Sequence, residues 1–389
     1  MEDIKNSVEA HEGSLGRDIS PTWRKASSLA MAYQNLRLLP LSLFAAFGDT
    51  IGIAGRFGEG GGKLAFQAFL QGLKDVYARW KTAASDMPAD RQKTVWEDIA
   101  EMIGAVDSHM FLEQLGKAHN SEFMTDLARR TNRALFMANG LTAWDRSMRV
   151  SGTKAAVLFL QHHASLPDKQ HSKRWLAELG LAPKDIPLDA DGKLITDRHV
   201  LAAAKGIDLD KATAEMDRVH TALVRWVEGA VLTPNAGQRP TWASDPHYAV
   251  LFHLKQFTYS FQDTILRRAF NEASHGNMNP IGALAAAVPT MVAADMVKGL
   301  VVGGGSFPAY MKAWDAGDWI QHGIQRAGHL GVAQFGVDAM SDPTSLLGPT
   351  VDQATDFIWK PTEVLGNIHN AIPGVRMIRD VPDFVRVTG

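Results

Sequence analysis

Apolar residues recur every three or four positions between residues 246 and 270, in the stretch PHYAVLFHLKQFTYSFQDTILRRAF. Such spacing places successive apolar side chains on one face of an α-helix. A segment that contains Pro240 and Trp242 precedes this stretch, and an Arg-Arg pair lies close to its end. We therefore expect this organising helix to be the element around which the fold is built, marked by Trp242, Phe257, Phe261, Arg267 and Arg268.

The least polar segment of the chain follows at residues 281–304, after the turn-forming residues 275–280. As a helix with a rise of about 1.5 Å per residue it would be roughly 36 Å long, enough to cross a bilayer. Its Leu, Ile and Val residues favour insertion by about 2.4–4.8 kcal/mol in total, whereas Asp295 and Lys298 together cost about 5–7 kcal/mol. Insertion of this helix alone is therefore unfavourable.

Asp295 and Lys298 lie three residues apart and can pair on one side of this helix. Its small residues at positions 282, 285–287, 293 and 294 suit close contact between helices. Two interpretations stay open: a core helix of a soluble fold, or one helix of a membrane bundle whose polar residues face inward. In either case we expect the segment to act through Ile281, Leu284, Val288, Val292, Asp295, Lys298 and Leu300.

The rest of the chain predicts further helices that are separated by Gly and Pro. They include residues 22–37, 64–81, 141–163 and 209–232, and in the second of these Leu73 is expected to face the core. Residues 186–195 hold an Asp-Gly pair between two short apolar arms, a pattern typical of a β-hairpin. The predicted fold class is all-α, an elongated or bundle-like assembly of helices with one small β-hairpin near residues 186–195.

The length of 389 residues exceeds the ~250–300 at which one core stops growing, so several units are expected. We predict a disordered lead at 1–20, an N-terminal helical domain at 21–165, a small helical subdomain with the hairpin at 166–240, and a C-terminal helical domain at 241–389. The net charge of −2 means that any nucleic-acid or membrane site must be a local patch. The absence of cysteine excludes disulfides and thiolate chemistry.

No motif in the sequence indicates an enzyme. The glycine run at residues 58–62 lacks the spacing and the Ser or Thr of a phosphate-binding loop. Ser151 and Lys154 have the spacing of a Ser-x-x-Lys motif without its partner motifs. His162, His163 and His171 lack the ligand spacing of a metal site. We therefore expect no catalytic residue, no metal and no cofactor.

One region of the chain is clearly basic. Six cations and a single carboxylate, Asp145, lie between residues 129 and 154, and these cations could bind DNA phosphates or anionic lipid headgroups. The simpler interpretation is a solvated helix face on which Asp145 pairs with the cation four residues later. The patch consists of Arg129, Arg130, Arg133, Arg146, Arg149 and Lys154.

Three blocks of the sequence resemble a known group of proteins. They are LPLSLFAAFGDTIGIAG at 39–55, GLTAWDRSMR at 140–149, and the segment RPTWASDPHYAVLFHLKQFTYSFQDTILRRAF at 239–270. These blocks are similar to the C-terminal region of large virion-associated polyproteins and internal virion (ejection) proteins of tailed phages. The resemblance implies a protein that is packaged inside the virion and moves to the host cell envelope after ejection.

The resulting hypothesis is a non-enzymatic ejection protein that oligomerises and helps form a conduit across the host envelope for the genome. The implied partners are copies of itself, other virion or portal and tail proteins, double-stranded DNA in transit, and host membrane lipids. One alternative is an intracapsid scaffold or portal-associated protein that binds DNA through residues 129–154. A second alternative is an unrecognised hydrolase that uses Ser151 or the histidine cluster.

Overall fold

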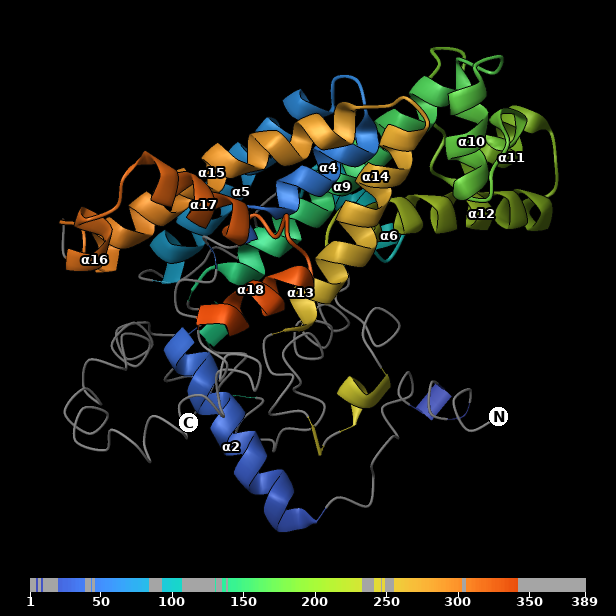
Figure 1. Ribbon diagram of the computed structural model, residues 1–389. Helices are drawn as coiled ribbons and strands as arrows, with labels where there is room; N and C mark the ends of the chain where they lie inside the picture. The colour runs from blue at the N-terminus through green and yellow to red at the C-terminus, as the bar shows by residue number, and fades with distance from the viewer. Residues whose placement is uncertain are drawn as a thin grey trace.

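The computed structural model describes a protein built from α-helices (Figure 1). The described residues are 5, 8–9, 20–38, 43, 46–83, 93–106, 130, 135–137, 139–232, 241–245, 247–248, 255–302 and 306–341. No strand forms among these residues, so the predicted all-α class is confirmed. The predicted disordered lead lies almost entirely outside them, as do residues 342–389.

The first half of the chain forms helices α2 (Pro21–Leu38), α4 (Asp49–Phe57), α5 (Gly61–Ala83), α6 (Val95–Met102) and α9 (Leu141–Ala164). The middle forms α10 (Gln170–Glu178), a 3₁₀ turn η2 (Pro183–Asp185), α11 (Arg198–Lys205) and α12 (Leu209–Glu228). The last part forms the 3₁₀ turn η4 (Thr241–Ser244), α13 (Gln256–Phe261), the π-helical η5 (Gln262–Leu266), α14 (Arg267–Ser274), α15 (Asn279–Val302), α16 (Ala309–Lys312), α17 (Ala316–Arg326) and α18 (Ala333–Ser341). The helices predicted at 22–37, 64–81 and 141–163 form, and the one predicted at 209–232 forms as far as Glu228.

Helix α9 is the central element, and it contacts α4, α5, α6, α10 and α12. Trp144 and Met148 on this helix are fully buried. The Trp144 ring packs against Phe47 and Phe69 at centroid distances of 4.8 and 5.8 Å, and its indole N–H donates to the carbonyl of Ala46 at 3.0 Å. Figure 1 shows α16 and α17 at one end of the helical body and α10, α11 and α12 at the other, with α15 running along the body toward α16.

Buried residues from all three predicted helical units join one hydrophobic core cluster, which extends from Leu43 to Ala327. Trp226 of α12, Phe159 of α9 and Ile265 near the start of α14 all belong to it. The domain boundaries at 165 and 240 stay predictions, because a shared core neither requires nor forbids separate folding units.

Polar side chains at helix starts explain several of the boundaries. Thr94 and Glu97 form a reciprocal capping box at the start of α6, and Asp208 accepts the Lys211 N–H at 2.9 Å at the start of α12. Asp315 and Asp318 cap α17 in the same way. These side chains satisfy backbone N–H groups that the first turn of a helix leaves unpaired.

The predicted β-hairpin is reduced to a single antiparallel bridge between Leu188 and Leu194. The turn itself forms as expected: the Asp189 N–H donates to the Lys193 carbonyl at 2.8 Å, and Gly192 adopts a φ of 76°. The arms do not extend into strands because Pro187 has no N–H to donate, and because Asp197 already caps α11.

Helix α4 packs closely against the C-terminal end of α12 at Gly52. A Cβ added at Gly52 would lie 1.8 Å from the carbonyl oxygen of Ala230, whereas a Cβ at Gly55, one turn later, would meet Pro280 at 3.6 Å. The backbones of α4 and the α12 terminus can therefore approach this closely only because position 52 has no side chain.

These two glycines give a matched test of the packing. Gly52→Ala should lower the free energy of unfolding by about 1–3 kcal/mol or more, because the two segments must separate. Gly55→Ala should raise it by about 0.5–1 kcal/mol, because alanine favours the helix and has room there. Urea unfolding measures the free energy of unfolding of both variants. Equal effects of the two substitutions would contradict the close approach at Gly52.

Candidate functional site

Helix α15 coincides with the apolar segment that the sequence singles out, and its two faces differ in burial. The inward face contacts α4, α14 and α17, and its buried members include Leu284, Ala287, Met291, Ala294 and Asp295. The outward face carries no charged side chain from position 282 to position 300, and the half-buried Thr290 at its edge donates its hydroxyl to the Ala286 carbonyl at 3.1 Å. Its exposed residues are Gly282, Ala285, Ala286, Pro289, Ala293, Met296, Val297 and Leu300.

This distribution is unusual for a helix on the surface of a soluble protein, which normally turns charged and polar residues outward. Val297 is 49% exposed and Leu300 is 38% exposed. Among the described residues, α15 provides the one helix long and apolar enough to cross a membrane. Of its most apolar stretch of 18 residues, 33% is buried. The core of a soluble protein can contain such a helix, but there most of it is buried. Here only a third of it is buried.

Helix α17 packs closely across the middle of α15. A Cβ added at Gly323 would lie 2.6 Å from a methyl group of Val292 and 3.1 Å from the Val288 carbonyl. Val288 and Val292, both predicted members of the segment, therefore lie in the contact with α17. Ile281 and Leu284, near the start of α15, pack into the main core. Of the residues that the sequence predicted for this segment, Leu300 faces outward, and the others lie in or beside the contacts of α15 with other helices.

Asp295 is the buried charge of α15, and its partners are on α17. Arg326 places its Nη2 3.1 Å and its Nε 3.1 Å from Asp295 Oδ1, and His322 Nε2 lies 3.1 Å from Oδ2. The Asp295 side chain is only 4% exposed. The carboxylate is thus bound by two groups across the helix contact, and not by Lys298 as predicted. We call Asp295, His322 and Arg326 the Asp295 clasp.

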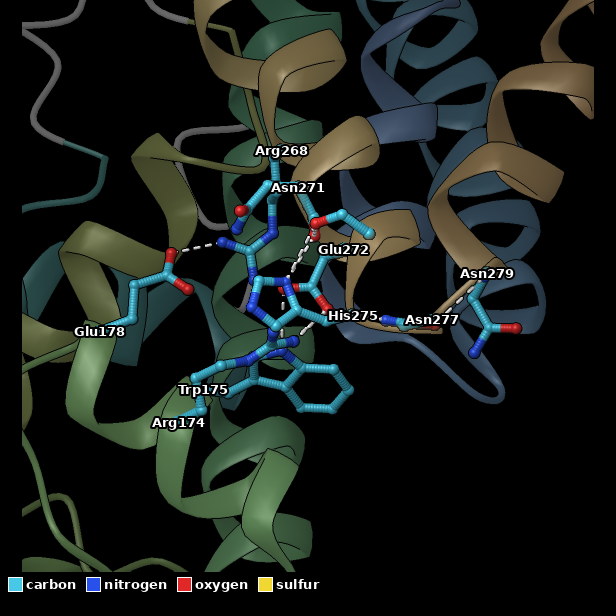
Figure 2. Close-up of polar contacts among 10 residues, drawn as sticks. Arg174, Trp175, Glu178, Arg268, Asn271, Glu272, His275, Asn277 and Asn279 are labelled. Atoms are coloured by element: carbon cyan, nitrogen blue, oxygen red, sulfur yellow. Dashed lines mark hydrogen bonds and ion pairs between the residues drawn. The ribbon is translucent and has the colours of Figure 1, made fainter.

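A second polar network holds the start of α15 (Figure 2). The carboxylate of the buried Glu272 accepts hydrogen bonds from Arg174 at 2.6 Å, from the Trp175 indole at 3.1 Å and from the Asn277 amide at 3.0 Å. Asn277 in turn accepts the backbone N–H of Asn279 at 3.2 Å. Glu272 therefore joins α10 of the middle region to the turn from which α15 begins.

The organising helix forms in part as predicted. Residues 256–274 are helical, Phe261 is buried, and Phe257 belongs to α13; residues 249–254 lie outside the described part of the chain. Arg268 pairs with Glu178 of α10, which also accepts from Arg56 at 3.4 Å. Arg267 is exposed and pairs with Asp263 at 3.1 Å.

Trp242 does not belong to this helix. It lies in the short turn η4, is 49% exposed, and packs edge-on against Tyr248 at a centroid distance of 6.1 Å. The sequence pattern placed Trp242 at the entry to this helix, but a large aromatic residue at a loop can pack locally without entering the core.

The π-helical turn η5 was not predicted from the sequence. It places the Gln262 amide oxygen 2.8 Å from the backbone N–H of Val332, in the loop between α17 and α18. Phe261 packs against Gly328 in the same loop, where a Cβ would lie 3.0 Å from the ring. A π-helical turn contains one extra residue, which shifts the side chains that follow it around the helix axis. The spacing of apolar residues in a sequence does not indicate where such a turn forms.

The predicted basic patch does not form an open cationic face in the described residues. Arg149 is 5% exposed and donates to Asp145 at 2.8 Å, which confirms the pair expected from the simpler interpretation. Arg146 donates to Glu101 of α6 at 3.0 Å. Arg130 is exposed, Lys154 is half-buried, and Arg129 and Arg133 lie outside the described residues.

Beside this pair lies a second carboxyl group. Burial, together with the nearby charge of Asp145, raises the pKa of Asp49 at the start of α4 to about 8, although Trp144 and Arg149 act in the opposite direction. Asp145 already has Arg149 as its ion-pair partner. One guanidinium cannot fully compensate two carboxylates, so the folded protein holds Asp49 protonated at neutral pH.

The histidine cluster is a packed aromatic group. His163 is 2% exposed, its Nδ1 lies 3.0 Å from the Ser172 hydroxyl, and its ring packs against Phe159 and Trp175. Burial and the neighbouring His162 and His171 lower the pKa of His163 to about 4. No group of three or more potential ligands in the described residues could hold a metal ion.

Comparison of the chain with protein-family models, with curated proteins and with solved structures finds no match. The candidate site is therefore defined by its own geometry: an outward apolar face on α15, held to the body by the Asp295 clasp and the Glu272 network.

The Asp49 pKa predicts a pH dependence of stability. Because the folded state binds this proton more tightly than the unfolded state, stability should fall as the pH rises from about 4 to about 8. Asp49→Asn should remove this pH-dependent loss of stability and so raise the free energy of unfolding at pH 8 by up to about 5 kcal/mol relative to the native protein. Urea unfolding between pH 5 and 8.5 measures it, with the exposed Asp217→Asn of α12 as the control. A native-like pH profile for Asp49→Asn would contradict the assignment.

The Asp295 clasp predicts an asymmetry between two arginines. Arg326→Met should cost about 2–3 kcal/mol of unfolding free energy, because it leaves a buried carboxylate with His322 as its remaining partner. Arg267→Met removes a pair in which the Arg267 side chain is 79% exposed, and should cost under about 0.5 kcal/mol. Thermal or urea unfolding compares the two, and equal small losses would show that the clasp does not hold α17 to α15.

Proposed function

We propose that this protein is a non-enzymatic internal virion (ejection) protein of a tailed phage, which oligomerises and helps form a conduit across the host cell envelope. Its partners in this role are copies of itself, other virion proteins, lipid and the passing DNA. The observation that carries the proposal is the outward face of α15, whose exposed residues from 282 to 300 are all apolar. The sequence blocks that resemble such proteins support the same function.

An apolar face of this length suits contact with a hydrocarbon environment. Water-exposed Val297, Leu300 and Met296 lie along one side of a helix whose buried side already has its partners. Transfer of that outward side into the interface of a membrane removes apolar surface from water and requires no charge to leave water.

Full insertion of α15 is a different step, and Asp295 controls its energetics. A bare carboxylate at the centre of a bilayer costs about 2.5–3.5 kcal/mol on insertion scales. If α17 moves with α15, Arg326 and His322 stay beside the carboxylate and the helix contact over Val288 and Val292 is kept. The α15–α17 pair, and not α15 alone, is therefore the unit that we expect to enter a membrane during assembly.

The structure gives less support to the two alternatives. Binding of DNA through residues 129–154 would require free cations, and Arg146 and Arg149 are bound to carboxylates of the protein itself. A hydrolase would require a nucleophile and a base that a substrate can reach, and the one such contact among the predicted histidines, His163 with the Ser172 hydroxyl, is buried in an aromatic cluster with Ser172 0% and His163 2% exposed. We therefore retain the ejection protein as the single proposal.

Flotation with vesicles tests the proposal directly. The purified full chain should float with vesicles that contain anionic lipid, and Val297→Glu should lower the bound fraction about tenfold or more, because a charge then lies in the middle of the apolar face. Val200→Glu on α11 is the matched control, since Val200 is also an exposed valine, at 56%.

Two results would overturn the proposal. One is that the native chain neither binds such vesicles nor oligomerises at any pH between about 5 and 8. The other is that Val200→Glu and Val297→Glu weaken flotation equally, since α15 would then have no special part in binding.

A further inference from the structure

Helix α5 has a second apolar face that no described part of the chain covers. Its inward side, with Ala65, Ala68 and Val76, packs against α4 and α9. Beside that side lies a row of exposed large residues at intervals of four, three and four positions. The row, here called the α5 seam, consists of Phe66 (62% exposed), Leu70 (41%), Leu73 (36%) and Tyr77 (67%).

The α5 seam contradicts the expectation that Leu73 faces the core, and the reason is geometric. In a helix the buried Val76 and the exposed Leu73 lie three residues apart, about 60° around the axis. Both belong to one broad apolar surface, of which α4 and α9 cover only part. Spacing alone cannot tell which edge of a wide apolar stripe lies under another helix.

The intervals between the residues of the α5 seam, four, three and four positions, are the same in both directions along the helix. An aromatic residue lies at each end and two leucines lie between them. If a second α5 lies antiparallel against the first, Phe66 of one copy meets Tyr77 of the other, and Leu70 meets Leu73. A two-fold interface requires such self-complementarity, because the same surface must serve both copies. Intervals of three and four residues are also those of knobs-into-holes packing.

The exposed area is close to what a specific dimer needs. Aromatic side chains offer about 150–250 Å² each, so Phe66 and Tyr77 at their observed exposures present roughly 250 Å² on one copy. With the two leucines, two copies would bury roughly 800 Å². The aliphatic parts of Gln67 and Lys74 beside the seam bring this toward the ~1,000 Å² of a weak specific interface.

Charges do not oppose this pairing. In the antiparallel arrangement Lys74 of one copy lies near the neutral Gln67 of the other, and so does not face a second lysine. Asp75, the acidic residue of this stretch, already accepts a hydrogen bond from Gln71 of its own helix at 3.0 Å.

We propose that the α5 seam binds the α5 seam of a second copy of this chain, antiparallel, and so forms a two-fold dimer. The proposal deepens the self-association that the proposed function requires by naming one of its surfaces, and it does not depend on membrane binding. It predicts a dimer in solution without lipid.

A charge-exchange experiment on the full-length protein tests both the partner and the direction of pairing. Leu70→Glu and Leu73→Lys, each alone, should weaken the dimer at least tenfold in sedimentation equilibrium, because a charge then faces a leucine. A mixture of the two variants should restore association to within about threefold of the native value, because the carboxylate introduced in one copy then faces the ammonium group introduced in the other. Parallel pairing would place position 70 against position 70 and would give no such restoration.

Leu209→Glu is the matched control, since Leu209 on α12 is 42% exposed, as Leu70 is 41%. This variant should dimerise like the native protein, and circular dichroism should show native helix content for all variants. A native chain that stays monomeric up to about 0.1 mM, or a dimer that Leu70→Glu leaves intact, would overturn the proposal. So would a mixture that does not reassociate.

Vesicle flotation of the same variants separates this proposal from the proposed function. Leu70→Glu should lose the dimer in solution and still bind vesicles through α15, whereas Val297→Glu should lose vesicle binding and keep the dimer. If Leu70→Glu instead abolishes flotation and leaves self-association unchanged, lipid and not a second copy covers the α5 seam.

Discussion

The Asp295 clasp fixes which side of α15 faces the protein. One carboxylate in the middle of an otherwise apolar helix must find a partner when it is buried, and Arg326 and His322 of α17 supply it. Once Asp295 is turned inward, the helical repeat places no charged residue from 282 to 300 on the outward side, where the hydroxyl of Thr290 is bonded to the Ala286 carbonyl. The exposed apolar face is therefore a consequence of the polar contact. At the other end, the Glu272 network fixes where the helix begins.

The fold class could be predicted from the sequence, because helical periodicity and turn residues are local properties. The long helices, the Asp-Gly turn and the Asp145–Arg149 pair are all as expected. The site was predictable only in part. The partner of Asp295 lies 31 positions away and depends on how α17 crosses α15, so the pattern favoured the local Lys298. The exposure of Leu73 and Trp242 and the π turn at Gln262 likewise depend on tertiary packing.

Two uncovered apolar surfaces thus lie on helices that share one neighbour. Helix α4 contacts both α5 and α15, and its Gly52 lets it lie directly against the end of α12. Large apolar patches on soluble proteins mark sites of protein or membrane contact. The α5 seam has bulky side chains in a self-complementary order, which suits another copy. The α15 face has small side chains and a long apolar run, which suits lipid or closely packed helices.

We expect the outward face of α15 to meet lipid, and the lack of native cysteine allows a direct measurement. Single cysteines at Ala293 and Val297, and at Val200 as a reference, can each carry a polarity-sensitive fluorophore. On addition of vesicles containing anionic lipid, we expect emission from positions 293 and 297 to shift to shorter wavelength, while emission from position 200 stays unchanged. No shift at 293 and 297, or an equal shift at all three positions, would contradict the account.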